Sequence, residues 1–270
     1  MKEIAPTLAT SSAALPPEGA QSASGRPSGG FFRTRIKICG LTREADVDAA
    51  VQAGADAIGF VLYSKSPRYV TPERAAMLAR RLPSFVTPVL LFVNAEPALV
   101  RRACELLPNA TLQFHGDETP ALCLALAKAS NDRPYPRSYL RAARIPLSED
   151  AAHFDLVQFA QDYSTAQAIL LDAHVDGYGG AGKTFNWSLL PPNVNAHLVL
   201  SGGLDSANVG DGIAALRSRG KSLAVDVSSG VEALDAAGTP QKGIKDPQRI
   251  RAFVAAVRAA DAAYSEALGA

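Results

Sequence analysis

Cys39 is the residue whose type and position best suit proton-transfer chemistry. It follows Lys37 by two positions and precedes Gly40, at the end of an apolar run that contains Ile36 and Ile38. Side chains of a strand alternate between its two faces, so Lys37 and Cys39 are expected on one face and the isoleucines on the other. A thiol beside an ammonium group can be held partly as thiolate, which is a base or a nucleophile. The alternative is a free cysteine that packs as a small apolar residue.

Asp172 is the second candidate, because it ends the apolar run 169–171. A carboxylate at the end of an apolar strand needs hydrogen bonds, contact with solvent at that strand end or a raised pKa. The alternative is an aspartate that caps a helix or orders a loop. A base and an acid on opposite sides of one substrate suit an isomerisation that moves protons, with Cys39 and Asp172 as the pair.

Two short loops directly follow strands and could bind a phosphate through backbone amides. The first contains Gly202 and Gly203, and the second contains Ser228, Ser229 and Gly230. Exposed amides in such turns bind anions without side-chain charge.

A third glycine-rich segment, 177–183, ends in a lysine and formally matches a nucleotide-binding P-loop. The segment after Phe185 is too short for the long helix that a P-loop opens. We predict instead a mobile lid, whose residues are Gly179, Gly180, Gly182 and Lys183.

Three more polar residues are candidates for substrate binding. Arg68 lies in a basic loop and could hold a carboxylate by a bidentate contact, or be a solvated surface arginine. Asp226 could accept hydrogen bonds from sugar hydroxyls or belong to an interior polar layer, and His115 could contact substrate or be a satisfied core histidine. The other histidines show no metal-ligand spacing, so no metal is predicted.

These residues are distributed over eight alternations of a short apolar run and a helical pattern. The predicted strands are 36–39, 57–62, 89–93, 111–115, 138–143, 168–172, 198–203 and 223–230. Helices are predicted after Thr42, Thr71 and Asp205, each as a capping residue. Further helices are predicted over 97–107, 118–129 and 149–160, near Trp187 and from Asp246.

This alternation predicts parallel strands covered by helices, as a closed (β/α)8 TIM barrel or as a doubly wound open sheet. Polar residues recur at the C-terminal ends of the strands, where barrel active sites lie. The two phosphate-type loops follow the seventh and eighth strands, their usual place in barrels. Both features favour the closed barrel.

The bulk composition excludes several classes of protein. The chain has 270 residues, 47% of them apolar, and can bury one large core. A net charge of +1 without basic clusters gives no reason to expect nucleic acid or membrane partners. Three widely spaced cysteines indicate a reducing compartment, so a cytoplasmic protein is predicted. We predict a disordered tail over 1–32, the barrel over 33–262 and a frayed tail over 263–270.

The combined pattern resembles phosphoribosylanthranilate isomerase, an enzyme family of tryptophan biosynthesis. The matching segments run in chain order from about Arg35 to about Ala260. They are KICGLT (37–42), GADAIGFVLYSKSPRYV (54–70), LFVN (91–94), QFHG (113–116), ILLD (169–172), YGGAGKTFNW (178–187), LSGGL (200–204), AVDVSSGVE (224–232) and GIKDPQRIRAF (243–253). The stretches 130–138 and 234–242 look longer than a minimal member.

The resemblance implies an Amadori rearrangement of N-(5-phosphoribosyl)anthranilate, a small phosphosugar, to a 1-deoxyribulose 5-phosphate. It implies Asp172 as general acid, Cys39 as general base, Arg68 near the anthranilate, and the two glycine loops around the phosphate. No cofactor or metal is implied, and members are monomers or homodimers. A related isomerase of histidine biosynthesis would have an aspartate where this chain has Cys39. A catalytically silent barrel would lack Cys39 or Asp172.

Overall fold

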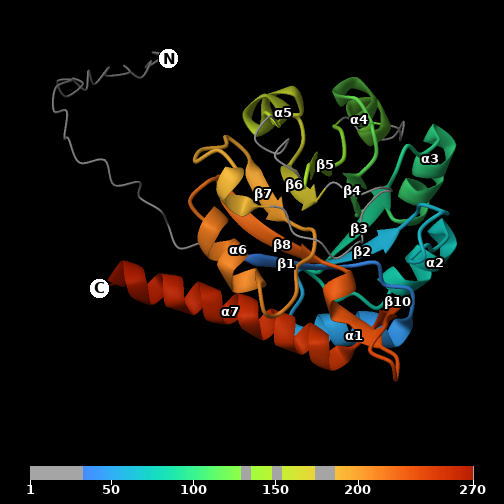
Figure 1. Ribbon diagram of the computed structural model, residues 1–270. Helices are drawn as coiled ribbons and strands as arrows, with labels where there is room; N and C mark the ends of the chain where they lie inside the picture. The colour runs from blue at the N-terminus through green and yellow to red at the C-terminus, as the bar shows by residue number, and fades with distance from the viewer. Residues whose placement is uncertain (1–32, 129–134, 148–153, 174–185, 270) are drawn as a thin grey trace, which may run out of the picture. The chain divides into compact units, whose positions relative to one another are not determined.

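Eight parallel strands close into a barrel in chain order, with β1 paired to both β2 and β8 (Figure 1). The computed structural model describes residues 33–128, 135–147, 154–173 and 186–269. The strands are β1 Arg35–Cys39, β2 Ala57–Val61, β3 Thr87–Phe92, β4 Thr111–Phe114, β5 Tyr139–Ile145, β6 Ala168–Ala173, β7 His197–Leu200 and β8 Ser222–Val227. The predicted closed barrel is confirmed.

Helices surround the barrel on its outside (Figure 1). They are α1 Glu44–Ala53, α2 Pro72–Ala79, α3 Pro97–Leu106, α4 Pro120–Ala127, α5 Leu156–Asp162, α6 Val209–Leu216 and α7 Pro247–Gly269, with single 3-10 turns η2 Trp187–Leu189 and η3 Ser229–Val231. Ile36 and Ile38 pack into the large apolar core between strands and helices. Because neighbouring residues point the other way, Lys37 and Cys39 face the barrel interior, as the alternation predicted.

The helix starts follow the predicted capping chemistry in one case and not in another. The Thr71 side chain accepts a hydrogen bond from the Arg74 amide, and Pro72 occupies the first turn of α2. Thr42 does not cap α1, which begins at Glu44. Its hydroxyl instead donates to the carbonyl oxygen of Gly243 at 2.8 Å, so this prediction was wrong.

The C-terminal helix is longer than predicted. We expected a frayed end over 263–270, but α7 continues to Gly269. Buried Asp261 anchors it by accepting hydrogen bonds from the amide and hydroxyl of Thr34, at 3.0 and 2.6 Å, and by pairing with Arg217. The predicted tail over 1–32 lies outside the described residues.

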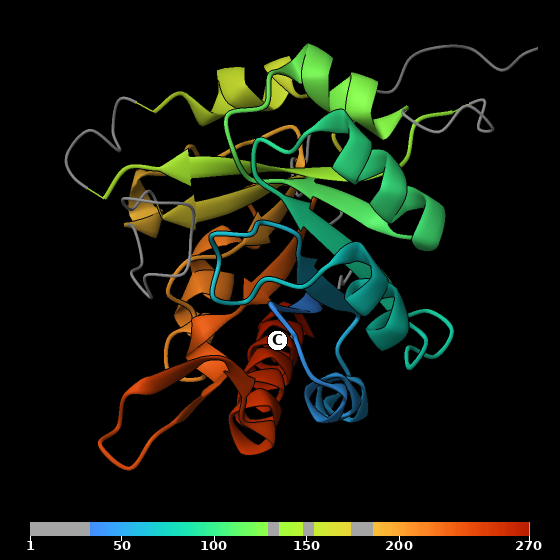
Figure 2. The ribbon, with the colours of Figure 1, turned by 90° about the vertical axis from the view of Figure 1, so that its right-hand side faces the viewer.

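An antiparallel hairpin not foreseen from the sequence follows β8. It consists of β9 Glu232–Leu234 and β10 Pro240–Lys245. Figure 2 shows it at the end of the barrel toward which the strands point. In the described part of the chain, no helix is both long enough and apolar enough to span a membrane.

Candidate active site

The two residues predicted to move protons lie at the same end of the barrel. Cys39 is the last residue of β1, and Asp172 is the penultimate residue of β6. Their exposed fractions are 4% and 5%. Because the strands are parallel, both side chains lie at the C-terminal mouth, where barrel enzymes carry their catalytic groups.

The Cys39 thiol lies in a tight environment beside Lys37. A Cβ atom placed on Gly59, the β2 residue paired with Cys39, would lie 2.6 Å from Cys39 Sγ and 3.1 Å from Lys37 Cε. Only glycine leaves room there for both side chains. Burial raises the pKa of the thiol, and the neighbouring Lys37 ammonium offsets part of that effect.

Asp226 on β8 holds the Lys37 ammonium in place. Lys37 Nζ donates to Asp226 Oδ1 at 2.8 Å, and the Ser201 hydroxyl donates to Oδ2 at 3.3 Å. Burial is the largest single effect and opposes the charge on Lys37, but Asp226 and Cys39 together outweigh it and raise the lysine pKa. Asp226 therefore forms the interior polar layer that was one of its two predicted roles, directly below Cys39.

The Asp172 carboxylate contacts the His115 ring, and the ring in turn contacts the Gln113 amide. His115 Nε2 lies 2.9 Å from Asp172 Oδ2, and Gln113 Nε2 lies 3.0 Å from His115 Nδ1. All three side chains are buried. The other carboxylate oxygen faces the next strand, since a Cβ atom on Gly202 would lie 2.7 Å from Asp172 Oδ1.

The two predicted phosphate loops lie against each other. Gly202 and Gly203 have positive φ values of 79° and 64°, which glycine adopts without strain. A Cβ atom on Gly230 would lie 1.9 Å from the carbonyl oxygen of Leu204, so the backbones of the two loops touch. Among the described residues nothing accepts a hydrogen bond from the amides of Gly202, Gly203, Ser229 or Gly230.

Arg68 is buried rather than solvated. Its Nε and Nη2 donate to the two carboxylate oxygens of Glu232 at 2.6 and 2.9 Å, a bidentate ion pair. The side chain lies against Gly40, where a Cβ atom would be 2.5 Å from Arg68 Cδ. Arg68 therefore reaches the end of β1, next to Cys39.

Ser228 uses its hydroxyl inside the protein. The hydroxyl donates to the carbonyl oxygen of Cys39 at 3.1 Å. Lys245 Nζ donates to the carbonyl oxygen of Ser228 at 2.8 Å and lies 3.4 Å from Glu232 Oε1. Burial lowers the pKa of Lys245 to about 8, despite the neighbouring Glu232 carboxylate. Lys245 thus ties the loop after β8 to the hairpin.

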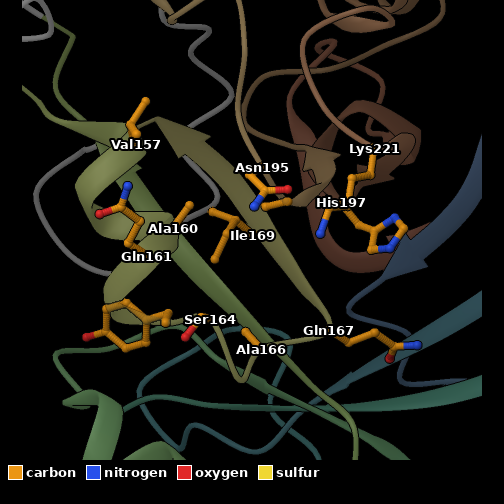
Figure 3. Close-up of a pocket in the computed structure, with 12 residues that line it drawn as sticks. Val157, Ala160, Gln161, Ser164, Ala166, Gln167, Ile169, Asn195, His197 and Lys221 are labelled. Carbon is orange, nitrogen blue, oxygen red and sulfur yellow. The ribbon is translucent and has the colours of Figure 1, made fainter. Parts of the chain in front are cut away.

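Cavities lie at the opposite, N-terminal end of the barrel, and two of them border the starts of β6 and β7. The one in Figure 3 has a volume of about 240 Å³ and lies between α5 and the starts of β6 and β7, where Gln167 and His197 line it. A larger one of about 620 Å³ is lined by Arg35, Phe85 and Ala168, among others. Neither contains Cys39 or Asp172, and in the described ranges no cluster of three or more metal-binding side chains occurs.

A sequence model of the family described as N-(5'phosphoribosyl)anthranilate (PRA) isomerase matches residues 36–256. The chain belongs to this family. The matched span contains all the residues of the mouth described above.

Individual members of the family are similar over nearly their whole length. An N-(5'-phosphoribosyl)anthranilate isomerase of Methylibium petroleiphilum is 59% identical over 231 residues, which cover 86% of this chain and 97% of that protein. A crystal structure of monomers of the dimeric isomerase of Thermotoga maritima has a TM-score of 0.62 at 33% identity, covering 84% of this chain and 99% of that one. A complex of the isomerase with reduced 1-(o-carboxyphenylamino)-1-deoxyribulose 5-phosphate has a TM-score of 0.63, at the same identity and coverage.

Three residues of the mouth were not predicted from the sequence. Gln113, Glu232 and Lys245 lie in segments that match the isomerase family, but none of them was given a role. Both charged residues are fully enclosed by the hairpin and the loop after β8. The predicted lid residues Gly179, Gly180, Gly182 and Lys183 lie outside the described residues.

Proposed function

We propose that this chain catalyses the Amadori rearrangement of N-(5-phosphoribosyl)anthranilate to 1-(2-carboxyphenylamino)-1-deoxyribulose 5-phosphate, in L-tryptophan biosynthesis. The observation that carries the proposal is the pairing of Cys39 and Asp172 at the mouth of a barrel of this family. Three free, buried cysteines suit a reducing compartment, so we place the reaction in the cytoplasm.

Asp172 acts first, as the general acid. It protonates the ring oxygen of the ribose while the C1–O bond breaks, and the nitrogen lone pair forms an iminium. Cys39, as thiolate, then removes the proton from C2, and the released electron pair forms the C1=C2 bond of an enolamine. Tautomerisation of the enolamine gives the ketone, so the net reaction is an isomerisation.

The surroundings of the two groups support these roles. The acid must hold a proton while the base has lost one, which requires different environments within one pocket. Asp172 has a histidine as its neighbour, whereas Cys39 has the Lys37 ammonium. The ammonium stabilises a thiolate.

The ends of the substrate have complementary partners. We assign the phosphate to the amides of Gly202, Gly203, Ser229 and Gly230, with Ser228 shaping the loop from inside. We assign the anthranilate carboxylate to Arg68. Glu232 fixes the guanidinium through Nε and Nη2, which leaves its remaining N–H groups for that carboxylate. His115 contacts the acid, and Asp226 acts on the Cys39 thiol through the Lys37 ammonium that it binds.

The test uses the fluorescence of the anthranilate group. Purified protein should quench the signal of freshly made N-(5-phosphoribosyl)anthranilate. Cys39→Ala and Asp172→Asn should each lower kcat by at least about two orders of magnitude, the usual contribution of a positioned acid or base. The matched controls are Cys104→Ala on α3 and Asp162→Asn on the surface of α5. Full activity in either active-site variant would overturn the roles, and an inactive wild type would overturn the function.

We further propose that the protein is a homodimer that associates through the N-terminal end of the barrel. The Thermotoga maritima relative is described as dimeric. In this chain Phe85 is fully exposed and lies at the rim of the 620 Å³ cavity at that end. A large exposed apolar side chain beside a hollow suits a second copy of the same surface.

A further inference from the structure

Gln113 is a buried amide whose side chain makes one hydrogen bond within the described part of the chain. Its exposed fraction is 0%, and its Nε2 lies 3.0 Å from His115 Nδ1. Its Oε1 has no hydrogen-bond partner among the described residues. Leaving a buried polar atom unpaired costs free energy, so this side chain is kept for a reason other than stability.

The chemistry of the amide fixes the proton on the histidine. An amide NH2 group only donates, so His115 Nδ1 must accept, and the proton of the neutral ring is then on Nε2. Nε2–H donates to Asp172 Oδ2 at 2.9 Å. As it lies, the amide leaves its carbonyl oxygen and one N–H unpaired among the described residues, whereas turning it over would leave both N–H groups unpaired, which is the costlier arrangement because buried unpaired N–H groups are the rarer of the two.

Other charged groups near His115 favour the same state. Arg141 on β5 donates to the carbonyl oxygens of Phe114 and Gly116, on either side of His115 in the chain, at 3.0 Å each. That positive charge disfavours a second one on the ring, although the buried Glu118 carboxylate, 3.5 Å from Arg141 Nη1, offsets part of it. Asp172 is the facing group that favours an imidazolium, and Gln113 opposes it because a doubly protonated ring would place N–H against N–H.

We propose that Gln113 is a positioning residue that keeps His115 neutral with its proton on Nε2, so that the transferable proton of Asp172 is held on Oδ1. This inference rests on the proposed function, which makes Asp172 the acid. Oδ2 is occupied by the histidine, whereas Oδ1 faces Gly202 in the loop assigned to the substrate phosphate. After proton transfer, the same Nε2–H group stabilises the carboxylate that remains.

The first measurement is made on the wild-type protein. Nitrogen NMR of protein labelled in its four histidines reports which ring nitrogen carries the proton. The signal of His115, identified by its loss in His115→Asn, should be that of a neutral ring protonated on Nε2 at neutral pH. A ring protonated on Nδ1, or an imidazolium, would overturn the proposal.

The second measurement changes the amide. Gln113→Glu replaces the donor with an acceptor that favours Nδ1–H, so His115 becomes an imidazolium that keeps Asp172 ionised. We expect kcat to fall by at least about tenfold while KM changes little, because Gln113 is fully buried and bonded to His115. Gln113→Met keeps similar bulk without a charge and should give a mixture of neutral ring forms with a smaller loss. Gln248→Glu, the same change at an exposed position in the first turn of α7, is the control.

These outcomes separate the two proposals. An unchanged kcat in Gln113→Glu, or equal losses in both variants without an imidazolium signal, would contradict the role of Gln113 while leaving the isomerase activity intact. A wild type that shows the Nε2–H ring but does not turn over substrate would contradict the proposed function instead.

Discussion

Lys37 and Asp226, which form an ion pair, shift the pKa of the Cys39 thiol in opposite directions. Burial raises the thiol pKa, the Lys37 ammonium lowers it, and the Asp226 carboxylate raises it. Because Lys37 Nζ and Asp226 Oδ1 are only 2.8 Å apart, their effects partly cancel at the sulfur. Cys39 can therefore act as a base at neutral pH only if the Lys37 ammonium is nearer to its sulfur than the Asp226 carboxylate is.

Removing either charge should move the pH dependence of the reaction in a direction that the pKa argument fixes. The base must be a thiolate, so activity is lost as pH falls below the thiol pKa. Lys37→Met raises that pKa and should move the acidic limb of kcat/KM to higher pH by about one unit. Asp226→Asn lowers it and should move the same limb to lower pH. The position of the limb is independent of any overall loss in rate.

Full pH–rate profiles of the wild type and both variants are the measurement. Lys221→Met, at an exposed position immediately before β8, is the control for loss of a lysine. Shifts of the same sign in the two variants would contradict this electrostatic account of Cys39.

At the scale of elements, the hairpin β9–β10 supplies the charges that support the mouth from outside the barrel. Glu232 on β9 accepts from Arg68, from the Gly243 amide at 2.8 Å, and from Lys245. Burial opposes its ionisation, but these partners together lower its pKa. The hairpin thus fixes the guanidinium assigned to the anthranilate and the loop assigned to the phosphate.

Lys245→Met should weaken substrate binding more than it slows the chemistry. The substitution removes the hydrogen bond to the Ser228 carbonyl, which holds the loop after β8. A bond from a charged group contributes up to about 2 kcal/mol, so we expect KM to rise by about tenfold with a small change in kcat. Lys242→Met, at an exposed position of the same strand β10, is the control. A loss confined to kcat would show that Lys245 acts on the reacting groups instead.

Period-two and strand–helix patterns predicted the barrel because they report local burial. They placed Lys37 and Cys39 on one face and all eight strands within a few residues. The hairpin was missed, since residues 234–242 interrupt the alternation and were interpreted as a longer loop. The pairing of Arg68 with Glu232, 164 residues apart, depends on tertiary contacts that no local pattern contains. For the same reason Thr42 was assigned as a cap, although its partner is Gly243.

At the scale of the molecule, the two ends of the barrel have different surfaces. The C-terminal mouth is lined by polar side chains that bond to one another, such as the Asp172–His115 and Lys37–Asp226 pairs. The N-terminal end has the larger cavity, with Phe85 and Leu140 among its lining residues. Association through that end leaves the mouth open to substrate.

Phe85 gives the clearest test of the proposed dimer. Its backbone has a φ of 71°, which a bulky residue rarely adopts, and its side chain is fully exposed. Burying a phenylalanine contributes about 2 kcal/mol per copy, and a twofold interface counts each contact twice. Phe85→Ser should therefore convert a dimer to a monomer at micromolar concentration, measured by light scattering after size-exclusion chromatography.

Met77→Ser, which removes another exposed apolar side chain that lies away from the cavity on α2, should stay dimeric. Because Phe85 is at the opposite end from Cys39, the monomeric variant should keep its kcat. A monomeric wild type, or a Phe85→Ser variant that stays dimeric, would exclude this interface.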